Sequence, residues 1–69
     1  MTITLNQDFK KSSYFFARVA RMGEPKAQFL LGSMTYLEGL KMSPDTPQRG
    51  DFLAYGLMWV RVADLGGEI

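Results

Sequence analysis

The stretch AQFLLGSMTYLEG, residues 27–39, holds the pattern that decides the fold. Apolar side chains recur in it every three or four residues, the spacing of a buried helical stripe, at Ala27, Leu30, Leu31, Met34 and Leu37. Gly32 interrupts the stripe, although glycine inside a helix costs about 1 kcal/mol relative to alanine. We interpret Gly32 as the point where another helix crosses closely, with Phe16 or Trp59 against its backbone, because closer packing offsets that cost.

Residues on either side of this stretch predict the first two helices. The first runs from about 7 to 22, because Gly23 follows it as a left-handed C-terminal cap. The second covers about 25–38. Pro25 suits its first position, where a backbone N–H would be unpaired in any case, and Gly39 is expected to end it.

The rest of the chain predicts one loop and one more helix. Residues 40–50, LKMSPDTPQRG, combine prolines with other turn-forming residues and are expected to form a loop. A third helix follows over about 51–65, with Asp51 favourably placed for the helix dipole. No segment alternates with the period of a strand. The sequence therefore predicts one all-α domain over 1–69, in which an antiparallel helix-turn-helix pair follows the first helix and 1–6 is an N-terminal extension.

Composition limits the chemistry. The 69 residues include neither cysteine nor histidine, so a disulfide and a zinc site with Cys or His ligands are excluded. The seven acidic residues are scattered, and no serine or threonine has a histidine to activate it. We therefore predict no catalytic, cofactor-binding or metal-binding residues, no cofactor and no enzymatic activity.

Charge and hydropathy bear on location and partners. No apolar run reaches the roughly 18 residues of a membrane span, and the start does not resemble a signal peptide, so a cytoplasmic protein without a membrane partner is expected. The net charge of +1 argues against nucleic acid as a partner. Basic residues are nevertheless concentrated in the first helix, at Lys10, Lys11, Arg18 and Arg21, which leaves a nucleic-acid-binding regulator as an alternative.

The chain also contains an internal repeat. Residues 14–25, YFFARVARMGEP, align without gaps on residues 57–68, LMWVRVADLGGE, at an offset of 43. The alignment pairs residues of the same class: Phe16 with Trp59, Arg18 with Arg61, Val19 with Val62, Ala20 with Ala63, Met22 with Leu65 and Gly23 with Gly66.

The segment GEPKAQFLLG, residues 23–32, resembles the opening of a Sel1-like repeat, G-x-x-x-A-Q-(aromatic)-x-L-G. The resemblance extends over 14–67, about one and a half repeats; the departures are the long loop and Gly56, where alanine is common. It implies a tetratricopeptide-like α-solenoid that binds proteins and has no catalytic role. The expected structural residues are Phe16, Gly23, Ala27, Gly32, Gly39, Trp59, Ala63 and Gly66.

About three repeats are usually needed for a stable solenoid, so we expect this chain to form a homodimer or to dock on another protein. The short length favours a small regulator or inhibitor of the anti-activator or immunity type, phage or bacterial. A further alternative is a terminal fragment of a longer Sel1-repeat scaffold. The candidate partner contacts are Tyr14, Phe15, Arg18, Arg21, Tyr36 and Met42.

Overall fold

The computed structural model describes residues 7–67, and the predicted extension at 1–6 lies outside this range. Three helices make up the fold: α1 (Gln7–Ala20), α2 (Pro25–Lys41) and α3 (Arg49–Asp64). The prediction of an all-α fold is confirmed, and no strand occurs within the described residues.

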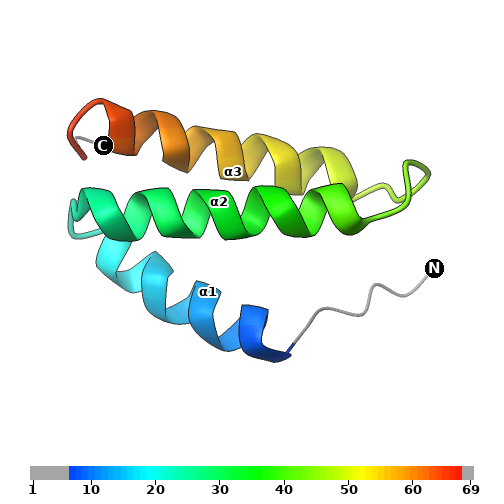
Figure 1. Cartoon of the computed structure of the whole chain (residues 1–69), viewed down its shortest axis with the longest axis horizontal. Helices are drawn as coiled ribbons and strands as arrows, with labels where there is room; N and C mark the ends of the chain where they lie inside the picture. Colours follow the sequence, from blue (N-terminus) through cyan, green and yellow to red (C-terminus); the bar gives the residue numbers. More distant parts are fainter. Residues whose placement is uncertain (1–6, 68–69) are drawn as a thin grey trace.

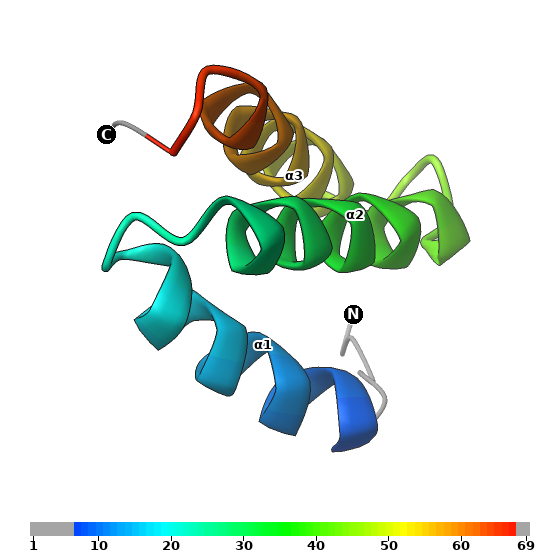
Figure 2. The same cartoon turned by 60° about the vertical axis from the view of Figure 1, so that its left-hand side comes forward.

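Helix α2 lies in the middle of the molecule (Figure 1). Helix α3 runs antiparallel along one side of α2, and α1 packs on α2 from another side. Turned by 60°, the same cartoon shows α1 inclined to α2, so that the two helices diverge from the turn that joins them (Figure 2). The predicted antiparallel pair is therefore present, with both flanking helices packed on α2.

The turn between α1 and α2 begins two residues earlier than expected, because α1 ends at Ala20 rather than near residue 22. Gly23 has the predicted left-handed conformation, with φ of +89°, and its N–H donates to the carbonyl of Ala20. Pro25 opens α2 as predicted, and the Glu24 carboxylate accepts a hydrogen bond from the Lys26 N–H.

Replacing Gly23 with alanine is expected to lower the free energy of unfolding by about 1–2 kcal/mol, because an L-residue is strained in the left-handed region. Gly50→Ala is the matched control: Gly50 has no positive φ, and a Cβ there would meet nothing within 4 Å. Urea denaturation followed by circular dichroism measures both variants. A Gly23→Ala protein as stable as the wild type would contradict the assignment of the cap.

The prediction that Gly39 ends the second helix is wrong. Helix α2 continues through Gly39 to Lys41, and the N–H of Met42 then donates to the Gly39 carbonyl. Gly39 is buried, and a Cβ there would lie 2.9 Å from Leu53 Cδ2. A glycine buried inside α2, against Phe52 and Leu53 of α3, was therefore interpreted as a terminator.

The loop and the third helix shift accordingly. The loop occupies 42–48 instead of 40–50, α3 starts at Arg49 instead of Asp51, and it ends at Asp64. Gly66 and Gly67 follow in a turn with φ of +90° and +89°.

A small core joins the three helices. Its buried apolar side chains are Ala20, Ala27, Leu31 and Trp59, and Phe16, Ala17, Val19 and Val62 pack against them. Phe16, Ala27 and Trp59 are thus core residues as predicted, and Ala63 is half-buried.

The expected buried stripe on α2 is only partly correct. Leu30 and Leu37 are exposed, whereas Gln28, Gly32 and Thr35 are buried together with Ala27 and Leu31. The reason is that α2 contacts helices on two sides, and small or polar side chains allow both neighbours to approach its backbone.

Helices α2 and α3 touch backbone to backbone at two glycines. A Cβ on Gly32 would lie 2.6 Å from the Gly56 carbonyl oxygen and 2.9 Å from the Val60 nitrogen. Reciprocally, a Cβ on Gly56 would lie 2.7 Å from the Gly32 carbonyl oxygen. A close crossing at Gly32 is confirmed, but the expectation that Phe16 or Trp59 sits there is wrong, because the backbone of α3 occupies that position.

Candidate functional site

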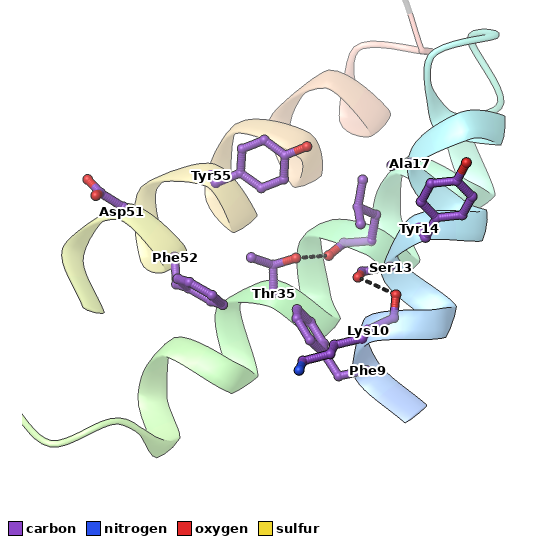
Figure 3. A pocket seen from close by; sticks show the side chains of 10 residues that line it. Phe9, Lys10, Ser13, Tyr14, Ala17, Thr35, Asp51, Phe52 and Tyr55 are labelled. Atoms are coloured by element: carbon purple, nitrogen blue, oxygen red, sulfur yellow. Dashed lines mark hydrogen bonds between the residues drawn. The ribbon is translucent and has the colours of Figure 1, made fainter. Parts of the chain in front are cut away.

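A groove of about 560 Å³ opens between α1 and α3, with α2 as its floor (Figure 3). Phe9 and Tyr14 come from α1, Phe52 and Tyr55 from α3, and Leu31 and Thr35 from α2. We call this surface the α1/α3 groove. Every helix contributes to it, so its shape depends on how α1 and α3 are held on α2.

Aromatic rings define the walls of the α1/α3 groove. The ring centroids of Phe9 and Phe52 lie 6.2 Å apart, so these two residues link α1 to α3. Tyr55 packs edge-on against Trp59, which anchors it to the core. Tyr14 is 69% exposed, and its ring is covered on one side by the Arg18 guanidinium, 5.8 Å from the ring centroid.

The two aliphatic hydroxyl groups of the groove, those of Ser13 and Thr35, are already used by their own helices. Thr35 Oγ1 donates to the Leu31 carbonyl at 2.7 Å, and Ser13 Oγ donates to the Lys10 carbonyl at 3.2 Å (Figure 3). With these two donors satisfied, the groove offers a mainly apolar, aromatic surface, to which Tyr14 and Tyr55 add their phenol hydroxyls.

Charges of opposite sign flank the groove. Lys10 lies on α1 and Asp51 on α3, and both side chains are exposed. They give the two walls different electrostatic character, which favours one orientation of an occupant over the reverse.

Of the six predicted partner contacts, only Tyr14 lines this groove. Arg18 reaches the site only through its contact with Tyr14. Phe15 is exposed and packs edge-on against Phe16, and Arg21 is exposed in the turn after α1.

The other two predicted contacts lie away from α1. Tyr36 is half-buried beside Gly56, and Met42 is half-buried at the end of α2. The structure therefore does not bring the six predicted residues together on one surface.

Phe9, Phe52 and Tyr55 line the groove but are not among the six residues predicted to contact a partner. One signal for them was present, because Phe9 and Phe52 are related by the same 43-residue offset as the internal repeat. The sequence did not show that α1 and α3 diverge enough to leave the two rings at an open groove.

A second groove, of about 670 Å³, lies between α2 and α3 alone. Phe29, Leu30 and Val60 form its apolar part, and Lys26, Arg61 and Asp64 also line it. It contains one aromatic ring where the α1/α3 groove contains four. Aromatic anchors carry much of the energy of protein recognition, which favours the α1/α3 groove as the binding site.

Within residues 7–67, His, Cys, Asp and Glu side chains do not gather in groups of three or more that could hold a metal ion. Among the same residues, no helix has the length and apolar character needed to cross a membrane.

Comparisons with known proteins identify no relative: no family model matches the chain, and no curated protein or solved structure is significantly similar to it. The resemblance to Sel1-like repeats therefore stays a prediction based on the residues quoted above.

Proposed function

We propose that this chain is a small non-enzymatic module that binds an amphipathic helical segment of another protein in the α1/α3 groove. The observation that carries the proposal is the set of four aromatic rings lining one open groove, Phe9, Tyr14, Phe52 and Tyr55. Grooves of this kind accept the apolar face of a helix, whose side chains fill the space between the walls.

The flanking charges define the partner further. An acidic residue of the bound segment would lie beside Lys10, and a basic residue would lie beside Asp51. A chain of this size acts most simply by occupying a helix that its target needs for another contact. A regulator or inhibitor of the anti-activator or immunity type fits that mode of action.

A nucleic-acid partner has less support. Lys10 borders an apolar groove, and Arg18 stacks on Tyr14 instead of extending freely from α1. Binding to a phosphate backbone requires a broad basic surface and weakens steeply with salt. A salt-dependent shift of duplex DNA in a gel would favour this alternative over the protein partner.

Photo-crosslinking identifies the partner and the surface together. A benzoyl-phenylalanine placed at position 14, in cells that make the protein, is expected to crosslink to a segment with helical apolar periodicity. The same group at position 15 serves as the control, because Phe15 is exposed on the same helix but does not line the groove. Equal crosslinking from both positions, or from position 15 alone, would contradict the proposal.

The matching mutational test measures how tightly variants of this protein bind the crosslinked segment, made as a synthetic peptide. Tyr14→Ala is expected to weaken binding by about tenfold or more, because a large aromatic contact is lost. Phe15→Ala is expected to leave the affinity nearly unchanged. Isothermal titration calorimetry measures both, and the reverse order of effects would place the binding surface elsewhere on α1.

A further inference from the structure

The side of α3 that faces away from α2 carries a stripe of exposed apolar and charged side chains. Gly56 and Val60 contact α2, and Met58 is two residues from each of them, so at about 100° per residue it points to the opposite side. The stripe consists of Asp51, Ala54, Met58, Arg61 and Leu65, spaced by alternating steps of three and four residues. This is the spacing of a coiled-coil seam, and we call it the α3 seam.

The α3 seam is exposed. Met58 is 44% and Leu65 74% accessible, and Leu57 beside them is also exposed. Within the described residues, neither the Asp51 carboxylate nor the Arg61 guanidinium has a hydrogen-bond or ion-pair partner. Two unpaired charges, Asp51 and Arg61, thus lie on either side of Ala54 and Met58 on one helix face.

We propose that the α3 seam binds the same seam of a second copy, antiparallel, around a twofold axis at the level of Gly56. In this register Asp51 of each chain faces Arg61 of the other, and Ala54 faces Met58. Opposite charges meet on both sides of the twofold axis, and a small side chain meets a large one between them. A twofold interface must be complementary to itself, and this register satisfies that condition in charge and in size.

A parallel arrangement of the two seams would not be complementary in charge. Asp51 would then face Asp51 and Arg61 would face Arg61, so that like charges would meet at both ends of the interface.

The antiparallel dimer leaves Phe9 and Tyr14 on α1 uncovered, since the seam lies on the far side of α3 from α2. Asp51 borders both surfaces, whereas Arg61 does not line the α1/α3 groove. The dimer therefore does not depend on the proposed segment-binding function, and a change at Arg61 tests the dimer separately from the groove.

Charge reversal tests the register. Asp51→Lys and Arg61→Glu are each expected to raise the dimer dissociation constant by about tenfold or more, because each places like charges together twice in the dimer. In an equimolar mixture of the two variants, the introduced lysine faces the introduced glutamate, and the remaining Asp51 faces the remaining Arg61. The mixed dimer is therefore expected to form with an affinity close to that of the wild type.

Sedimentation equilibrium over micromolar to millimolar concentrations measures these constants, and circular dichroism checks that each variant is folded. The control is Asp45→Lys, a charge reversal at an exposed loop position away from the seam, which should leave the dissociation constant unchanged. A wild-type chain that stays monomeric throughout the range would overturn the proposal. Single variants that dimerise like the wild type, or a mixture that fails to recover, would also overturn it.

Discussion

Gly32→Ala is expected to destabilise the protein by about 2 kcal/mol, although alanine is the better helix former. The new methyl group would lie 2.6 Å from the Gly56 carbonyl oxygen, 2.8 Å from Val60 Cγ2 and 2.9 Å from the Val60 nitrogen. Two of these three atoms belong to the backbone of α3, so no side-chain rotation relieves the overlap. Overpacking of this kind costs about 1–3 kcal/mol, and a backbone clash belongs at the upper end. The gain of about 1 kcal/mol in helix propensity offsets only part of it.

Two further variants distinguish the cost of the steric overlap from the gain in helix propensity. Gly56→Ala should cost a similar amount, because its methyl group would lie 2.7 Å from both the Gly32 carbonyl oxygen and the Tyr36 nitrogen. Gly50→Ala, at an open helical position, should be neutral or slightly stabilising. Urea unfolding compares all three with the wild type. A Gly32→Ala protein more stable than the wild type would show that α2 and α3 do not cross there.

Gln28→Glu is expected to destabilise the protein at pH 7 by about 3–5 kcal/mol, close to the whole stability of so small a domain. Gln28 is fully buried, and its Nε2 donates to the Ala20 carbonyl at 3.0 Å and to the Gly67 carbonyl at 3.1 Å. These two bonds join the end of α1 to the turn after α3. A carboxylate would place a buried negative charge against two carbonyl oxygens and would have no proton to donate.

Lowering the pH, and replacing Gln28 with an apolar residue, distinguish the cost of the buried charge from the cost of the lost hydrogen-bond donor. At pH 4 a protonated carboxyl group introduced at position 28 can donate one hydrogen bond, so part of the lost stability should return. Gln28→Met should cost less, about 1–2 kcal/mol, because it removes the donor together with the Oε1 atom, which has no partner within the described residues. Thermal unfolding at both pH values measures these changes. A Gln28→Glu protein within about 1 kcal/mol of the wild type at pH 7 would contradict the bridging role.

The helices could be predicted because their signals are local. Pro25 and Gly23 mark the turn before α2, and the repeated spacing of Phe16 and Trp59 identifies core positions on α1 and α3. Gly39 misled the prediction because a glycine that ends a helix and one that admits a neighbouring helix look alike in sequence. Only the position of Leu53 and Phe52 on α3 distinguishes the two roles.

The roles of Gln28 and Gly56 could not be predicted, because both depend on distant backbone groups. Gln28 Nε2 donates to two carbonyls that lie 8 and 39 residues away in the sequence, one at the end of α1 and one in the turn after α3. Gly56 was a departure from the Sel1-like pattern, yet it is the direct partner of Gly32 in the helix crossing. The α1/α3 groove likewise could not be predicted from the sequence, because its shape depends on how α1 is inclined to α2 (Figure 2).

An NMR titration tests the proposed binding site most directly. The segment crosslinked from position 14 is added as an unlabelled peptide to ¹⁵N-labelled protein, and amide shifts are followed residue by residue. The shifts are expected to concentrate around the groove residues of α1 and α3, Phe9, Tyr14, Phe52 and Tyr55. Shifts centred instead on Phe29, Leu30 and Val60, the second groove, would contradict binding in the α1/α3 groove.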